Sequence, residues 1–191
     1  MHIRFIGSHW TGKTTLMDLF PEKYIIKEVA RSVIKDWKKP QDMDFYEKIL
    51  FQRKVLERQL EEVKKREEDF KINDLIVSDR SIIDIFVYSR LLKTETQEQQ
   101  MVKQWLCCDI FKEMKNEKYD LTFYLPIEFD LEDDGIRFTD KDFQKKVDKE
   151  LLYVLQKLRV PYITLSGSVE ERKQKIKDVV KMFDGSRFQF K

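Results

Sequence analysis

The chain has 191 residues, of which 41% are hydrophobic and 13% aromatic, which favours one folded domain with a sizeable core over a disordered chain. Acidic and basic residues nearly cancel, at a net charge of +2, so the chain as a whole has no electrostatic preference for nucleic acid or a membrane surface.

The spacing of apolar residues changes repeatedly between the period of a strand and the period of a helix. Strands are predicted at residues 3–6, 23–29, 74–79, 119–125 and 161–165. Helices are predicted at 14–20, 30–37, 44–70, 82–92, 98–115, 139–158 and 168–183. Ser168 and Glu171 have the spacing of a capping box at the start of the last helix. Because strands and helices alternate, we expect one domain over residues 1–184, with a parallel sheet covered on both faces, and a tail over 185–191.

The cysteines and the first residues bear on location. Cys107 and Cys108 are sequence neighbours, and such a pair rarely forms a disulfide because the bridge would strain the backbone. We interpret them as the reduced thiols of a cytoplasmic protein. The opening stretch MHIRFIG is too short for a signal peptide, and no apolar run approaches membrane-spanning length. We therefore expect no membrane partner.

The stretch GSHWTGKTT, residues 7–15, matches the phosphate-loop pattern G-x-x-x-x-G-K-[ST], also called Walker A, at every required position. Gly7 and Gly12 allow a tight turn, so that backbone N–H groups and the dipole of the next helix face phosphate oxygens. Lys13 is predicted to reach the β- and γ-phosphates, and the Thr14 hydroxyl to bind Mg²⁺. The other candidate nucleotide-binding residues of the loop are Ser8, His9, Trp10, Thr11 and Thr15. His9 and Trp10 could equally only shape the loop, and Thr15 could be a helix residue.

A phosphate loop needs an acid at the end of a neighbouring strand to hold hydrated Mg²⁺. Asp79 follows the apolar run LIVS, and this strand should end on the same sheet edge as the loop. The alternative is a helix N-cap, which Ser78, Asp79 or Ser81 could provide. Arg80 either binds a phosphate or hydroxyl group of an acceptor or forms a structural ion pair.

Two further segments carry candidate charges. Glu28, at the end of the second predicted strand, could take the proton of an acceptor hydroxyl, with Arg31 orienting it. The alternative for Glu28 is a solvated residue in the first turn of a helix. The string DDGIRF, residues 133–138, is a glycine-hinged loop that could form a lid carrying Arg137 over the transferring phosphate. The alternative is an ordinary surface loop.

Several short motifs occur together in a familiar order. They are Gly7–Thr15, Glu28-Val-Ala-Arg31, Asp79-Arg80-Ser81 followed by Asp84 and Tyr88, Asp134-Gly135-x-Arg137, and Gly167 before a Glu/Arg-rich helix. In this order they resemble the NadR-like AAA-domain family of small P-loop kinases. That family includes nicotinamide riboside kinase domains and lies near thymidylate and deoxynucleoside kinases. The resemblance implies a P-loop NTPase fold of three α/β/α layers, whose five-stranded parallel sheet has the order 2-3-1-4-5.

The resemblance also implies roles for individual residues. It implies ATP as the phosphoryl donor with Mg²⁺, and a lid at about residues 127–139 with Arg137 near the phosphates. It places Glu28 and Asp79 near the acceptor hydroxyl. It also suggests that Gly167 and Ser168 lie near the adenine ring, and that Phe51 and Gln52 line the acceptor pocket. Asp84 and Tyr88, four residues apart on one helix face, could be pocket residues or packing residues.

The sequence thus predicts a kinase that moves the γ-phosphate of ATP to a hydroxyl or phosphate of a nucleoside, nucleotide or riboside-like small molecule. The predicted catalytic residues are Lys13, Glu28, Asp79 and Arg137, and the predicted acceptor-binding residues are Glu28, Arg31, Phe51, Gln52, Arg80 and Asp84. Two alternatives stay open: a kinase acting on a nucleic-acid 5′ end or a modified base, and a nucleotide-dependent switch or binding ATPase. The lack of an Asn-Lys-x-Asp motif for guanine argues against a GTPase switch. The acceptor, the choice of base between Glu28 and Asp79, and the oligomeric state are left open.

Overall fold

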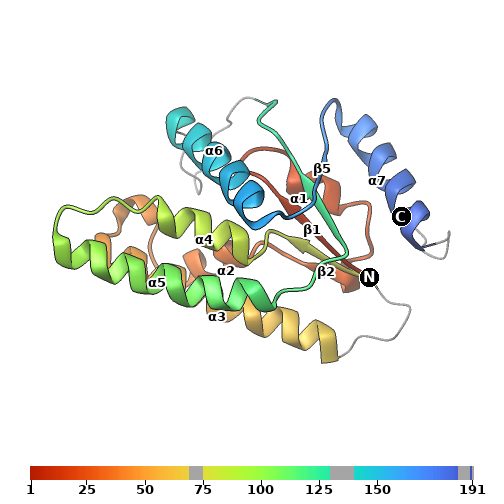
Figure 1. Cartoon of the computed structure of the whole chain (residues 1–191). Helices are drawn as coiled ribbons and strands as arrows, with labels where there is room; N and C mark the ends of the chain where they lie inside the picture. Colours follow the sequence, from red (N-terminus) through yellow and green to blue (C-terminus); the bar gives the residue numbers. More distant parts are fainter. Residues whose placement is uncertain (69–74, 130–139, 185–189, 191) are drawn as a thin grey trace.

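A computed structural model describes residues 1–68, 75–129, 140–184 and 190 of the chain. Within these residues, one parallel sheet has the strand order β2-β3-β1-β4-β5 (Figure 1). The strands are β1 (His2–Ile6), β2 (Ile25–Ile26), β3 (Ile76–Asp79), β4 (Leu121–Tyr124) and β5 (Ile163–Thr164). The predicted parallel sheet and its predicted strand order are both confirmed.

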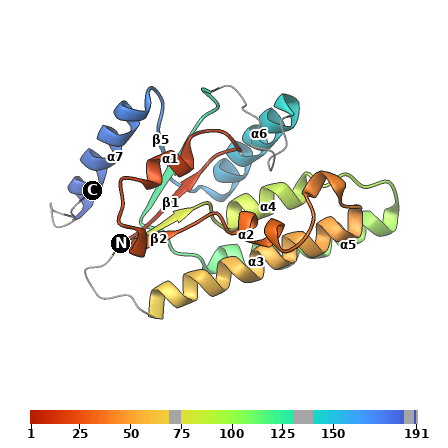
Figure 2. The ribbon, with the colours of Figure 1, turned by 180° about the vertical axis from the view of Figure 1, so that it is seen from behind.

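Helices cover both faces of this sheet, as Figures 1 and 2 show from opposite sides. They are α1 (Lys13–Met17), α2 (Val29–Lys35), α3 (Phe45–Glu68), α4 (Ile82–Arg90), α5 (Gln97–Asn116), α6 (Lys141–Leu158) and α7 (Val169–Asp184). Short 3₁₀ turns span Glu22–Tyr24 and Pro40–Asp42. Helices α1 and α7 lie on one face and α2 to α6 on the other, which gives the predicted three layers. None of the helices in the described ranges is both long and apolar enough to cross a membrane.

The alternation of side chains along β1 separates two apolar cores. Ile3 and Phe5 pack with residues of α1 and α7, whereas Ile6 packs with residues of α2 to α6. All of these side chains are fully buried. The two cores hold the sheet between its helical layers, so the strand ends are fixed relative to one another.

Two element boundaries differ from the prediction. Helix α1 ends at Met17 instead of Phe20, because the chain turns through i→i+3 hydrogen bonds and buries Phe20 against Phe5, with the ring centroids 6.0 Å apart. The second strand is much shorter than residues 23–29, because a 3₁₀ turn precedes it and Glu28 is already the N-cap residue of α2.

The parallel strands bring five loops to one edge of the sheet, which we call the carboxyl edge. At this edge lie residues 7–12 after β1, Glu28 after β2, Arg80 after β3, residues 125–129 after β4, and Gly167 after β5. The opposite edge, which we call the amino edge, contains Met1, Ile76 and residues 118–120. Cys107 and Cys108 lie on α5 as free thiols.

Candidate active site

The backbone between β1 and α1 folds into a tight loop that requires its two glycines. Gly7 and Gly12 have φ angles of +152° and +83°. A Cβ atom at Gly7 would lie 2.6 Å from the carbonyl oxygen of Leu125. Trp10 also has a positive φ, +62°, which is strained for a bulky residue. This loop therefore has the compact backbone that a phosphate-binding loop needs.

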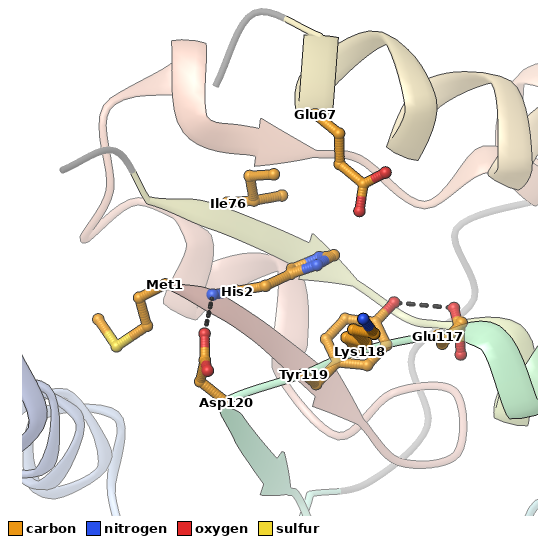
Figure 3. Close-up of a pocket in the computed structure, with 8 residues that line it drawn as sticks. All are labelled: Met1, His2, Glu67, Ile76, Glu117, Lys118, Tyr119 and Asp120. Atoms are coloured by element: carbon orange, nitrogen blue, oxygen red, sulfur yellow. Dashed lines mark hydrogen bonds between the residues drawn. The ribbon is translucent and has the colours of Figure 1, made fainter. Parts of the chain in front are cut away.

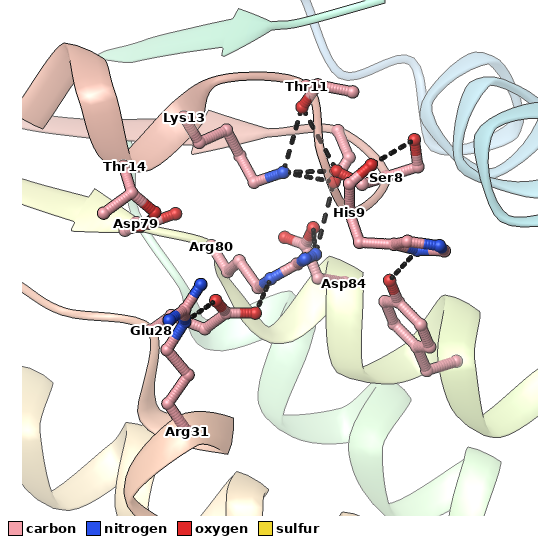
Figure 4. A network of polar contacts seen from close by, with 12 residues as sticks. Ser8, His9, Thr11, Lys13, Thr14, Glu28, Arg31, Asp79, Arg80 and Asp84 are labelled. Atoms are coloured by element: carbon pink, nitrogen blue, oxygen red, sulfur yellow. Dashed lines mark hydrogen bonds and ion pairs between the residues drawn. The ribbon is translucent and has the colours of Figure 1, made fainter. Parts of the chain in front are cut away.

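The side chain of Lys13 folds back over the loop (Figure 4). Its Nζ donates hydrogen bonds to the carbonyl oxygens of Gly7 at 2.8 Å and Ser8 at 2.5 Å, and to Thr11 Oγ1 at 3.1 Å. Burial lowers the pKa of Lys13 to about 7, and the positive charge of Arg80 acts in the same direction. The structure thus places a buried amine at the loop, where an anionic ligand would restore its charge.

Asp79 ends β3 beside the loop and contacts the start of α1. Thr14 Oγ1 donates to Asp79 Oδ2 at 2.9 Å. Asp79 Oδ1 is buried, and in the described part of the chain it has no hydrogen-bond partner. Burial raises the pKa of the Asp79 carboxyl, and the negative charge of Glu28 raises it further. A hydroxyl beside a carboxylate oxygen that is open for coordination is an oxygen donor set of the kind that Mg²⁺ prefers, so these residues fit the ion.

The donor set also limits what the protein alone can hold. Among the described residues, no group of three or more His, Cys, Asp or Glu side chains is placed to hold a metal ion. Thr14 and Asp79 would therefore supply only part of the coordination, with phosphate and water oxygens supplying the rest. This is the usual arrangement for Mg²⁺ in phosphoryl-transfer enzymes.

Arg80 connects the loop to the acids around it. Its backbone has a φ of +84°. Its Nε donates to Glu28 Oε1 at 2.6 Å, and its Nη1 donates to the carbonyl oxygen of Gly7 at 3.2 Å and to Asp84 Oδ1 at 3.1 Å. Arg80 therefore forms ion pairs with Glu28 and Asp84. A structural ion pair was one of the two interpretations of Arg80 that the sequence left open.

Glu28 lies between Arg31 and Arg80 in the polar network of Figure 4. Arg31 Nε donates to its Oε2 atom at 3.1 Å, while Arg80 binds the other oxygen. The Glu28 side chain is only 10% exposed. Glu28 is therefore held between two guanidinium groups and largely shielded from solvent.

Asp84 is buried behind Arg80 at the start of α4. Its Oδ2 accepts a hydrogen bond from Ser81 N at 2.9 Å, so it caps the helix as well as pairing with Arg80. Burial raises the pKa of Asp84, while the charge of Arg80 acts in the opposite direction. These contacts favour a packing role for Asp84, and a direct role in binding an acceptor stays a prediction.

The other predicted site residues lie in three places. Phe51 and Gln52 are buried on α3, and the Phe51 ring lies 6.5 Å from that of Trp37 between ring centroids. Gly167, with a φ of +93°, and Ser168 lie between β5 and α7. The predicted capping box is confirmed, because Ser168 N and Glu171 N each donate to the other residue's side chain. Arg137, with most of the predicted lid, and all of the predicted tail except residue 190 lie outside the described residues.

Two residues that contact the loop were missed by the sequence analysis. Arg172 of α7 donates to the carbonyl oxygen of Thr11, and Gln144 of α6 donates to that of His9. A signal was present in both helices. Residues 172, 176 and 180 share one helix face, as do 144, 147 and 151, and each face is apolar except at its first residue. A polar residue on an otherwise buried face calls for a specific partner.

The structure also has a pocket of about 440 Å³, which lies at the amino edge, away from the phosphate loop (Figure 3). It is lined by Met1, His2, Glu67, Ile76, Glu117, Lys118, Tyr119 and Asp120. These residues flank the starts of β1, β3 and β4, whereas the phosphate loop follows the end of β1. The hollow therefore contains none of the groups that could bind a nucleotide's phosphates at the loop.

The loop sequence after β1, the acid at the end of the adjacent β3 and the sheet order are those of the P-loop NTPase fold. The chain belongs to the family described as AAA domain, which matches residues 2–172. A search of curated protein sequences found no match.

Solved structures of similar fold include NadR proteins, thymidylate kinases and a deoxyadenosine kinase. NadR in complex with NR has a TM-score of 0.75 and 20% identity, over 98% of this chain and 52% of that chain. Thymidylate kinase from Candida albicans has a TM-score of 0.69 and 16% identity, over 100% of this chain and 96% of that chain. Deoxyadenosine kinase from M. mycoides has a TM-score of 0.64 and 13% identity, over 95% and 100%. The chain thus spans about half the length of NadR, and these likenesses show the fold.

Proposed function

We propose that this chain is an ATP- and Mg²⁺-dependent kinase whose acceptor is a nucleoside, nucleotide or riboside-like small molecule. The observation that carries the proposal is the contact of Thr14 with Asp79 beside the phosphate loop, with Asp79 Oδ1 open. The proteins of similar fold support the acceptor class, because one NadR structure contains NR and the others are thymidylate and deoxyadenosine kinases.

On the donor side, the loop's own groups bind the phosphates of ATP. Lys13 and the backbone N–H groups of residues 8–15 neutralise and orient them, and Thr14 with Asp79 holds Mg²⁺. When bound, Mg²⁺ would supply positive charge to the phosphates. Gly167 and Ser168 are proposed to lie near the adenine ring, and Arg137 near the γ-phosphate. Because the protein does little covalent chemistry in such a reaction, catalysis comes mainly from positioning and charge.

On the acceptor side, Glu28 lies at the same edge as Asp79, held between Arg31 and Arg80. An acceptor oxygen forms the new bond to the γ-phosphorus, the bond from that phosphorus to the bridging oxygen breaks, and ADP leaves. Either Glu28 or Asp79 takes the proton of an acceptor hydroxyl. The pH–rate profiles of Glu28→Gln and Asp79→Asn variants decide between them, because only loss of the base removes the acidic limb. Phe51 and Gln52 are proposed to line the wall that receives the rest of the acceptor.

The experiment is an acceptor screen with ATP and Mg²⁺. The panel contains nucleosides, nucleoside monophosphates, nicotinamide riboside and an oligonucleotide with a 5′-hydroxyl, and products are identified by mass spectrometry. A phosphorylated small molecule, formed by the native chain and lost in Lys13→Met, is the expected result. A phosphorylated oligonucleotide alone would favour the nucleic-acid kinase. ADP release with no phosphorylated product would contradict a kinase and favour a binding ATPase.

A further inference from the structure

Three side chains hold the phosphate loop: Arg80 from the turn between β3 and α4, Gln144 from α6 and Arg172 from α7. Every second carbonyl oxygen of the loop accepts a hydrogen bond from one of them. The pairs are Arg80 Nη1 with Gly7 O at 3.2 Å, Gln144 Nε2 with His9 O at 2.8 Å, and Arg172 Nη1 with Thr11 O at 2.7 Å. The loop's conformation is thus set by distant parts of the chain as well as by its glycines.

The direction of each held carbonyl also sets the direction of the next N–H group. A trans peptide unit is planar, and its C=O and N–H bonds point in opposite directions. The described peptide bonds include no cis bond. Holding the Thr11 carbonyl toward α7 therefore directs the Gly12 N–H away from α7. Backbone N–H groups are the donors with which such a loop binds phosphate.

Arg172 is the most deeply buried of the three donors, at 1% exposure. Its Nη2 donates to Glu128 Oε2 at 2.7 Å, and its guanidinium lies over the Phe129 ring, 4.6 Å from the centroid. Glu128 Oε2 also accepts from Gly167 N at 2.8 Å. One buried cation thus ties the phosphate loop to the loops that follow β4 and β5.

Gly12 shows how closely this arginine packs against the phosphate loop. A Cβ atom at Gly12 would lie 3.6 Å from Arg172 Nη1 and 3.4 Å from the Phe129 ring. With its φ of +83°, Gly12 is also in a conformation that L side chains rarely adopt. The guanidinium thus binds the Thr11 oxygen and leaves little room for a side chain at position 12.

We propose that Arg172 is a positioning residue for phosphate binding: it holds the Thr11 carbonyl outward and so aims the Gly12 N–H at the phosphates. The inference deepens the proposed function and rests on nucleotide binding at this loop. Arg172 acts through the backbone and needs no contact with the ligand. Losing it should weaken binding of any ligand with a polyphosphate group, whether or not the ligand has a base.

The test measures the dissociation constants of tripolyphosphate and of AMP-PNP by calorimetry with Mg²⁺, well below the unfolding midpoint of each variant. Arg172→Gln should weaken both ligands by about tenfold or more, since a misdirected N–H loses its charge-assisted hydrogen bond. The affinities of Arg172→Lys should lie between those of the native protein and of Arg172→Gln. An ammonium group keeps the charge, but it cannot bind the Thr11 oxygen and Glu128 together with the fork geometry of a guanidinium.

Two further variants separate positioning from stability. Lys175→Gln is the matched control, since Lys175 on the same helix also donates to a backbone carbonyl, that of Thr164, away from the loop. Its ligand affinity should stay within about twofold of the native protein. Glu128→Gln breaks the ion pair but leaves the Arg172 hydrogen bond to Thr11 in place. It should therefore lower the unfolding temperature, while tripolyphosphate affinity should fall much less than in Arg172→Gln.

The outcomes are distinct. If the Arg172 variants bind both ligands as the Lys175→Gln control does, the positioning role is wrong and the proposed function stands. The role is also wrong if affinity falls in proportion to lost stability across the Arg172 and Glu128 variants, or if AMP-PNP weakens while tripolyphosphate does not. If Arg172→Gln does not fold, Arg172→Lys decides by the same criteria. If the native protein binds neither ligand, the proposed function fails together with this role.

Discussion

The two edges of the sheet both contain buried charged groups, but they use them differently. At the amino edge, Arg4 lies 3.6 Å from Glu117 between charged atoms, donates to Thr122 at 2.9 Å and covers the Tyr119 ring at 4.3 Å. Tyr119 in turn donates to Glu117 at 2.9 Å. Each edge also holds one buried carboxylate oxygen for which the described residues supply no hydrogen bond: Glu117 Oε2, which faces Arg4, at the amino edge, and Asp79 Oδ1 at the carboxyl edge.

The two edges also differ in backbone conformation. Gly7, Trp10, Gly12 and Arg80, all at the carboxyl edge, have positive φ angles, whereas none of the residues lining the amino-edge pocket does. Strained backbone persists only where the surrounding structure holds it, and it gathers at functional sites. Burial of charge by itself therefore does not identify a site. An open coordinating oxygen together with a constrained backbone does.

The largest expected effect follows from removing the charge of Lys13. Lys13→Met should lower kcat/KM for phosphotransfer by roughly 10³-fold, the upper range for losing one charge-stabilising donor. Lys118→Met, in the amino-edge pocket, should change activity by less than about twofold. Equal losses in both variants would remove the distinction between the edges.

The next effect concerns the open oxygen of Asp79. Asp79→Asn should lower phosphotransfer by roughly 10²-fold and raise the Mg²⁺ concentration needed for half-maximal activity, because an amide is a weaker ligand than a carboxylate. The matched change at the amino edge is Asp120→Asn, which affects a residue that accepts a hydrogen bond from His2 N. A Mg²⁺ titration of both variants tests this. An unchanged Mg²⁺ requirement in Asp79→Asn would show that Asp79 does not hold the ion.

A smaller effect follows from the titration of Lys13. Its pKa of about 7 means that the amine of the free protein loses its proton as pH rises through 7. Phosphate binding favours the ammonium form, so binding takes up a proton above pH 7 and affinity falls as pH rises. The dissociation constant of AMP-PNP should rise by up to about tenfold per unit between about pH 7.5 and 9.

Lys13→Arg sharpens this prediction, because a guanidinium stays charged across the whole range. Its binding profile should be flat where that of the native protein slopes. Calorimetry in buffers with different ionisation enthalpies measures the proton uptake directly. A flat profile for the native protein would mean that Lys13 is already charged before phosphate binds.

The parts of the molecule that the sequence predicts well are those coded by neighbouring residues. The loop over residues 7–15 and the strand ending at Asp79 are local patterns, and they led to the sheet order through the family resemblance. The length of β2 was wrong because the 3₁₀ turn before it, with Tyr24 as its last residue, competes with the apolar run for the same residues.

Contacts between residues far apart in the sequence could not be predicted from such local patterns. Arg172 and Thr11 are 161 positions apart, and only the packing of α7 against the sheet brings them together. The pairing of Arg80 with both Glu28 and Asp84 depends on a positive φ at an arginine, which no pattern of residue types reveals. The polar residues that begin the apolar faces of α6 and α7 indicated that partners exist, but not which ones.

The smallest effect on activity is expected for a substitution of Glu117 at the amino edge, which should change stability but not phosphotransfer. Burial raises the pKa of Glu117 to about 7, above the unfolded value near 4. Its contribution to stability is therefore complete below the unfolded pKa and is lost as pH rises through 7. Glu117→Gln can still accept from Ile82 N and the Tyr119 hydroxyl but cannot ionise. Relative to the native protein, its unfolding free energy should rise by about 2 to 3 kcal/mol between pH 5 and 8 in urea titrations, because each pKa unit corresponds to about 1.4 kcal/mol. Phosphotransfer should stay within about twofold, since Glu117 lies apart from the phosphate loop. A large loss of phosphotransfer without a change in stability would show that the amino edge acts on the reaction after all.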